Sequence, residues 1–153
     1  MDILEKLQEK PPRILVVGDI MLDRFVFGTV ERISPEAPVP AVRSIKEKLS
    51  LGGCGNVLRN LINMGAHTSI VSFVGYDQAG KKILKDLNKK NISTKNIIQS
   101  KTCRTTEKMR VVADGQQLVR VDWDIGNITD RIINQLLELV SQKIKEVDGV
   151  IIS

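Results

Sequence analysis

Two aspartates follow the first strongly apolar stretch of the sequence. Residues 14–17 are all aliphatic, and Gly18, Asp19 and then Asp23 come after them. Such a run is typical of a strand buried on both faces of a parallel sheet, and open α/β folds bind ligands at the carboxyl ends of these strands. Ionised carboxylates accept several strong hydrogen bonds, so Asp19 and Asp23 are candidates for binding ligand hydroxyl groups. The alternative is that each caps or stabilises a turn.

Two basic residues form a second candidate site. Lys108 and Arg110 are two residues apart in a predicted strand, so their side chains share one face. Together they could neutralise a phosphate group, although an exposed basic sheet face is the alternative. The strand belongs to a predicted hairpin, because Asp114-Gly115 favours a type I′ turn between arms at residues 105–113 and 116–123.

A glycine-rich segment precedes a predicted helix. Gly52, Gly53 and Asn56 lie where free backbone donors and the helix dipole favour a polar or anionic ligand, and glycine lets a ligand approach the backbone. A purely structural turn explains the glycines equally well. The segment does not directly follow a buried strand, as a dinucleotide-binding motif requires.

Residues 75–82 nearly match a nucleotide-binding P-loop. Lys82 stands where that motif needs a serine or threonine for magnesium, and Asp77 would place a negative charge among the phosphates. We therefore predict an ordinary strand-to-helix turn with surface lysines. His67 has no carboxylate or second histidine near it in the sequence, so we predict a surface position.

Composition excludes several classes of protein. Cys54 and Cys103 lack the spacing of a disulfide framework or a zinc site, so we expect reduced thiols. The net charge is +5, but the basic residues are dispersed and aromatics make up 3%, so no nucleic-acid partner is predicted. No apolar run approaches the roughly 20 residues that span a bilayer, and the first ten residues mix acidic and basic side chains. These features predict a cytoplasmic protein without a membrane partner.

The elements that position these residues alternate between strands and helices. Helical periodicity predicts helices after Gly53, at residues 79–90 and from Thr129 onward, and aliphatic runs predict strands at residues 68–74, 97–98 and 148–152. Short strands at residues 25–28 and 39–42 flank a proline-bearing stretch, which predicts a protruding flap. The pattern is that of one α/β domain. The last predicted strand lacks a covering helix, so we expect a piece of a longer protein.

Five segments together resemble the ribokinase-like (PfkB) carbohydrate kinases. They are VVGDIMLDR at residues 16–24, RISPEAPVP at 32–40, GGCGN at 52–56, GYDQAG at 75–80 and GQQLVRVD at 115–122. The proline-rich segment and the last one look most like the heptose 7-phosphate kinase branch, which is a module of bifunctional heptose biosynthesis proteins. The resemblance runs from about residue 13 to residue 153.

This resemblance implies a Rossmann-like α/β ribokinase fold, of which residues 1–153 form the N-terminal part. It also implies a β-sheet lid, with strands within residues 24–49 and 105–123, that closes over the sugar and pairs with a second subunit into a homodimer. The family's sugar hydroxyls are held by residues that match Asp23 and the loop of Gly52, Gly53 and Asn56, although this loop is one residue shorter than usual. Lys108 and Arg110 become candidates for the phosphate already on the sugar.

The family's catalytic Gly-Ala-Gly-Asp motif does not occur in this sequence. No catalytic residue is therefore assigned within it, and the resemblance implies that the catalytic aspartate and the ATP-binding region lie beyond Ser153. The complete enzyme is expected to use ATP and Mg²⁺, which this stretch alone would not bind, to phosphorylate a sugar phosphate for ADP-heptose and lipopolysaccharide core synthesis. The alternatives are a non-catalytic sugar-phosphate-binding or dimerisation module, and a kinase of another sugar in the same superfamily.

Overall fold

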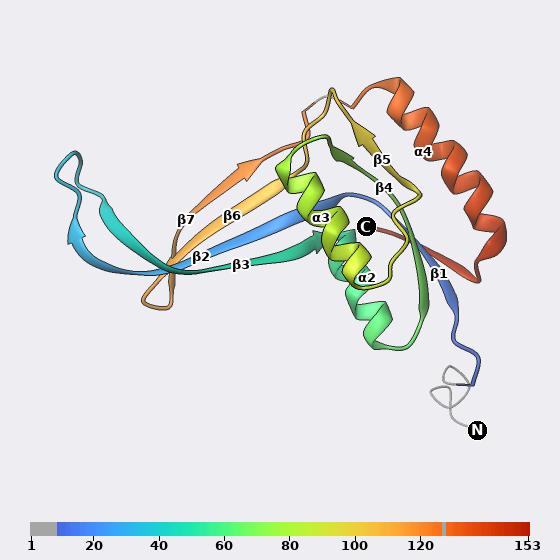
Figure 1. The fold of residues 1–153 in the computed structure, drawn as a ribbon, viewed down its shortest axis with the longest axis horizontal. Coiled ribbons are helices and arrows are strands. Elements are labelled where there is room, and N and C mark those ends of the chain that lie inside the picture. The colour runs from blue at the N-terminus through green and yellow to red at the C-terminus, as the bar shows by residue number, and fades with distance from the viewer. Residues whose placement is uncertain (1–8, 127) are drawn as a thin grey trace.

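The computed structural model describes residues 9–126 and 128–153, which form two four-stranded sheets (Figure 1). The first sheet is parallel, with the strand order β5-β4-β1-β8. Its strands are β1 (Arg13–Val17), β4 (His67–Gly75), β5 (Ile97–Ser100) and β8 (Gly149–Ile152). The predicted strands are thereby confirmed and the fold is of the α/β class, but β8 is not buried, because Ile152 is 84% exposed.

Helices cover both faces of the parallel sheet (Figure 1). The helices are α2 (Cys54–Asn63), α3 (Gln78–Lys89) and α4 (Asp130–Lys143), with the short 3₁₀ turn η1 (Ile144–Glu146) after α4. Successive residues of β4 point to opposite faces, so Ile70 and Val74 enter the core with α2 and α3, whereas Phe73 packs with Ile132 of α4. One strand thus supplies two cores.

The predicted apolar face of α4 is only partly buried. Ile132 is buried, but Leu137 is 59% exposed, and Ile133 and Ile144 are also exposed. By contrast, α3 buries Ile83 and Leu87 as its periodicity predicts. Within the described residues, no helix is both long enough and apolar enough to cross a membrane.

The strand order changes direction at β1. β4 and β5 lie on one side of β1 and β8 lies on the other. After β1 ends, the amide of Gly18 donates to the Val71 carbonyl and that of Asp19 to the Ser153 carbonyl, each over 3.3 Å. Asp19 therefore stands at a topological switch point, where open α/β sheets bind their ligands.

The second sheet, which we call the projecting sheet, has the strand order β3-β2-β6-β7 and extends away from the helices (Figure 1). Its strands are β2 (Ile20–Ile33), β3 (Pro40–Gly53), β6 (Glu107–Ala113) and β7 (Gln116–Trp123). β2 and β3 each contain 14 residues. The predicted flap is therefore present, but its strands are longer than the predicted ones at residues 25–28 and 39–42, and they extend beyond the predicted range of residues 24–49. Most residues of both strands are partly exposed or exposed. Because packing does not require them to be apolar at every second position, the sequence carries little alternation that would mark the strand ends.

The hairpin of β6 and β7 forms as its turn residues predict. Asp114 and Gly115 have φ angles of 50° and 81°, which are both positive as a type I′ turn requires. The sequence did not predict that β6 pairs in parallel with β2, which joins this hairpin to the flap in one sheet. Residues far apart in the chain thereby share one surface.

Candidate functional site

The Asp23 carboxylate lies against the backbone of Gly52. Asp23 is in β2 opposite Ser50 of β3, and a Cβ atom on Gly52 would lie 2.3 Å from Asp23 Oδ2. No residue with a side chain fits there without moving the carboxylate. Gly52 therefore lets another group approach its backbone closely, as glycine does in ligand-binding turns, and that group is the Asp23 carboxylate.

Gly53 has the same relation to Asp19. Its φ angle is 56°, and a Cβ atom on it would lie 2.2 Å from the Asp19 carbonyl oxygen. The Cys54 amide, at the start of α2, donates to that oxygen over 3.0 Å. The two glycines thus bring the ends of β1, β2 and β3 together, with the exposed Asp19 side chain at the switch point.

Polar side chains form two neighbouring rows across one face of the projecting sheet. Strand pairing places Ser50, Asp23, Lys108 and Asp122 side by side in the first row. It places Lys48, Phe25, Arg110 and Arg120 in the second. The predicted Lys108 and Arg110 therefore lie beside the predicted Asp23, although 85 or more residues separate them in the sequence.

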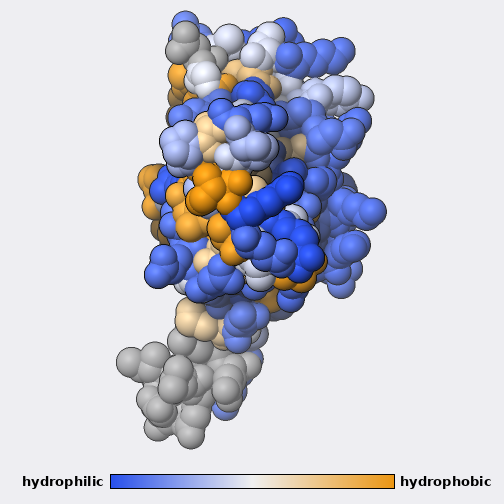
Figure 2. All heavy atoms as spheres, turned by 90° about the vertical axis from the view of Figure 1, so that its left-hand side faces the viewer, coloured by the Kyte–Doolittle hydropathy of each residue, from blue (hydrophilic) through white to orange (hydrophobic). Residues whose placement is uncertain are grey.

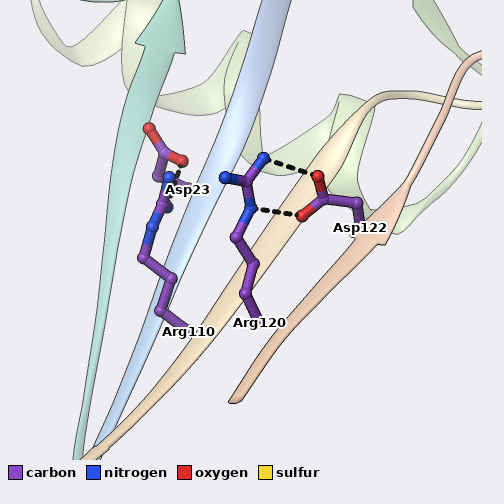
Figure 3. A network of polar contacts seen from close by, with 4 residues as sticks. All are labelled: Asp23, Arg110, Arg120 and Asp122. Carbon is purple, nitrogen blue, oxygen red and sulfur yellow. Dashed lines mark hydrogen bonds and ion pairs between the residues drawn. The ribbon is translucent and has the colours of Figure 1, made fainter. Parts of the chain in front are cut away.

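Two ion pairs link these rows (Figure 3). Arg110 NH1 donates to Asp23 Oδ1 over 2.7 Å, and the Arg110 guanidinium lies 5.1 Å from the centre of the Phe25 ring. Arg120 donates from Nε and NH2 to the two oxygens of Asp122, over 2.7 and 2.6 Å. The face thus carries carboxylates, which accept hydrogen bonds from hydroxyl groups, beside guanidinium groups, which match phosphate oxygens.

The charges on this face perturb one another. The hydrogen bonds from Arg120 lower the pKa of Asp122 against the opposing effect of burial, and the charges of Arg120, Lys108 and Arg110 lower it further. The pKa of Arg120 is raised, chiefly by its hydrogen bonds to Asp122. Arg120 and Asp122 therefore both stay ionised at neutral pH and remain an ion pair.

Strand pairing and backbone contacts bring Asp23, Gly52, Lys108 and Arg110 together and place Asp19 against Gly53, whereas Asn56 follows on α2 with a bond to its own helix. Asn56 is exposed in the first turn of α2, and its side-chain oxygen accepts a hydrogen bond from Arg59 over 2.5 Å. The predicted role of Asn56 as a sugar ligand remains a prediction.

Sequence reasoning missed Arg120 and Asp122 as members of the face. Counting outward from the Asp114-Gly115 turn would place Arg110 opposite Val119. A bulge between Val111 and Val112 shifts the pairing by one residue, so Arg110 lies opposite Arg120. The two-residue spacing of Arg120 and Asp122, equal to that of Lys108 and Arg110, was the available signal.

The P-loop-like turn is filled by its own aspartate. Asp77 caps α3, where Oδ1 accepts from the amide of Gly80 over 2.8 Å and Oδ2 from the amide of Thr105 over 2.7 Å. The turn is structural, as predicted. His67 is exposed, as the sequence analysis predicts, and both cysteines are buried.

The sequence pattern of pfkB family carbohydrate kinases matches residues 11–153. The chain belongs to this family. It is 44% identical over 142 residues to the bifunctional protein HldE of Helicobacter pylori strain P12, across 92% of this chain and 31% of that protein. It is 48% identical over 113 residues to HldE of Campylobacter concisus strain 13826, across 74% of this chain and 24% of that protein. The chain spans under a third of the length of these relatives.

Solved structures of sugar kinases share the fold of this pfkB-family chain. A carbohydrate kinase from Agrobacterium tumefaciens has a TM-score of 0.69 and 19% identity, across 92% of this chain and 45% of that one. Phosphofructokinase-2 from Escherichia coli, in complex with fructose-6-phosphate, has a TM-score of 0.68 and 20% identity, across 93% and 45%. The predicted ribokinase-like α/β fold is confirmed.

Proposed function

We propose that this chain forms the sugar-phosphate-binding part of an ATP-dependent heptose 7-phosphate kinase. The observation that carries the proposal is the ion pair of Asp23 and Arg110 beside Lys108, which combines an acceptor for sugar hydroxyls with donors for a phosphate. Family membership supports a carbohydrate kinase, and the similarity to bifunctional HldE proteins supports the heptose branch.

In this proposal, the sugar lies between the switch point and the projecting sheet. Asp19, Asp23 and the loop of Gly52, Gly53 and Asn56 bind its hydroxyl groups. Lys108 and Arg110 bind the phosphate that the sugar already carries, and the projecting sheet acts as the lid. The role of this chain is to select the substrate and hold it in place.

We assign no MgATP site to the described residues. The one turn that resembles a P-loop is filled by the Asp77 carboxylate, and the described residues contain no group of three or more histidine, cysteine or acidic residues that could hold a metal ion. We therefore propose that MgATP and the catalytic base are held by a part of the protein other than residues 1–153.

The test is phosphorylation by the full-length protein of heptose 7-phosphate, fructose 6-phosphate and unphosphorylated heptose with MgATP, followed by ADP release. We expect turnover of heptose 7-phosphate, and a loss of about 10- to 100-fold in kcat/KM in Asp23→Asn, because one charged hydrogen-bond partner of the sugar is removed. Glu31→Gln, at a distant ion pair with Arg43, is the matched control. Turnover of fructose 6-phosphate alone would assign another sugar, and binding without turnover would indicate a binding module.

We also propose that the projecting sheet joins two copies of the protein into a homodimer. Exposed apolar side chains lie on its strands, although charged residues dominate the rest of it. They are Ile33, Ile45, Leu49, Leu118 and Val119. Viewed from the tip of this sheet, hydrophobic surface gathers beside strongly hydrophilic surface (Figure 2). Exposed apolar groups of this kind mark interaction surfaces when they are contiguous.

A further inference from the structure

Arg110 forms an ion pair with the Asp23 carboxylate, which in the proposed function binds the sugar hydroxyl groups. Its NH1 group lies 2.7 Å from Asp23 Oδ1, and both side chains are only about one-fifth exposed. A sugar hydroxyl that donates to this oxygen must compete with a charged, partly buried hydrogen bond. Such a bond between two charged groups is stronger than the hydrogen bond that a neutral hydroxyl offers.

The neighbouring arginine is held differently. Arg120 is paired with both oxygens of Asp122, whereas Arg110 reaches Asp23 through a single nitrogen. A guanidinium group has five N–H donors, so most of the donor capacity of Arg110 is available to another anion. Of the two, Arg110 is therefore the arginine that can change its partner at the lower cost.

The surroundings allow Arg110 to move while Asp23 stays in place. The Gly52 backbone lies directly behind Asp23 Oδ2, which fixes that carboxylate on one side. Arg110 is supported by the face of the Phe25 ring, a contact that tolerates sliding better than a directed hydrogen bond does. The guanidinium can thus turn toward a ligand and remain over the ring.

We propose, on the basis of the proposed function, that Arg110 exchanges Asp23 for the phosphate of the substrate, and that this exchange frees Asp23 to accept sugar hydroxyls. A sugar without a phosphate would have to displace Arg110 and leave a partly buried cation without an anion. A sugar phosphate supplies the replacement anion itself. Arg110 thereby makes tight binding of the sugar conditional on its phosphate.

The first test needs no variant. Calorimetric titration of the full-length protein with unphosphorylated heptose is done with and without millimolar inorganic phosphate. We expect phosphate to strengthen heptose binding, because two ligands that compete with the same internal ion pair favour each other's binding. No effect of phosphate, or weaker heptose binding in its presence, would overturn the exchange.

The second test uses Arg110→Met. We expect its affinity for heptose 7-phosphate to fall about 10- to 100-fold, while unphosphorylated heptose binds at least as well as in the wild type and becomes indifferent to phosphate. Arg43→Met removes the same charge from the distant ion pair with Glu31, and it should preserve the preference for heptose 7-phosphate over unphosphorylated heptose. An equal loss of affinity for both sugars in Arg110→Met would refute the exchange but would leave the proposed function standing. If the wild type binds neither sugar, the proposed function fails as well.

Discussion

At the scale of single residues, Gly52 sets the position of the Asp23 carboxylate. A Cβ atom there would lie 2.3 Å from Asp23 Oδ2 and 2.8 Å from the Met21 side chain, so Gly52→Ala must displace both of them. We expect a loss of about 1–3 kcal/mol in the free energy of unfolding, as overpacking of a closed site costs, together with weaker sugar-phosphate binding. Urea unfolding and calorimetric titration measure the two effects.

Gly149→Ala is the control for Gly52→Ala. Gly149 lies in β8, and a Cβ atom there would have its nearest contact at 3.3 Å, with the flexible end of Ile14. We expect this variant to bind sugar phosphate as the wild type does. Undiminished binding in Gly52→Ala would show that Asp23 does not need its present position.

Cys54 gives a prediction about pH. Burial raises the pKa of its thiol to about 12 from the ordinary value of 9.0, against an opposing hydrogen bond with Ser72. Since the folded state holds this proton more tightly, the resulting stability is complete below pH 9 and is lost as the pH rises from 9 toward 12. We expect iodoacetamide to leave Cys54 unmodified in the folded protein at pH 8, and to modify it in urea.

Mass spectrometry of the alkylated peptides checks this prediction for each cysteine. Cys54→Ser is the reference for the pH dependence, because it lacks the thiol and should lose less stability between pH 9 and 12. Rapid alkylation of native Cys54 at pH 8 would contradict its burial.

At the scale of elements, Asp77 ties the start of α3 to the segment that leads into β6. It accepts hydrogen bonds from Gly80 at the helix start and from both the amide and the hydroxyl of Thr105. Burial alone would raise the pKa of Asp77, but these bonds and the charge of Arg104 outweigh it, so its pKa lies below 3.8. The ionised carboxylate therefore stabilises the fold.

We expect Asp77→Ala to lower the free energy of unfolding by about 1–2 kcal/mol at neutral pH, through the loss of a helix cap. The stability that ionised Asp77 contributes is present above the ordinary carboxyl pKa and is lost as the pH falls through the lowered pKa of Asp77. The difference in free energy of unfolding between Asp77→Ala and the wild type should therefore shrink in acid. Urea unfolding at several pH values measures it. Asp86→Ala, which removes only a surface pair with Lys90, should cost under about 1 kcal/mol at every pH.

The elements differ in how much of them the sequence could predict. α3 was predictable because buried positions such as Ile83 and Leu87 repeat with the helical period, and β4 because its apolar run is buried without interruption from Ile70. β2 and β3 were not, since most of their residues stay partly exposed and packing does not dictate a pattern. The site followed the same rule. Asp23, Lys108 and Arg110 could be named from their types, but Arg120 needed a register that a bulge had shifted.

At the scale of the whole molecule, the proposed homodimer makes a testable demand on the projecting sheet. Val119→Lys places a charge among its exposed apolar side chains, and we expect self-association of the full-length protein to weaken by about tenfold or more with no change in thermal stability. Sedimentation velocity over a range of concentrations measures this. Met64→Lys, at an exposed position next to the end of α2, is the control. Equal association of the two variants would exclude this sheet as the interface.

The parallel pairing of β2 with β6 also has a consequence for how the protein folds. Asp23 and Arg110 are 87 residues apart, so the face that they share exists only after the intervening chain has become ordered. The hairpin of β6 and β7 has a local turn and can form in about 1–10 μs, but its docking onto β2 is a slow, long-range step. The single tryptophan of residues 1–153, Trp123, lies in that hairpin opposite Glu107. Its fluorescence during refolding should therefore mark the moment at which the ligand-binding face is completed.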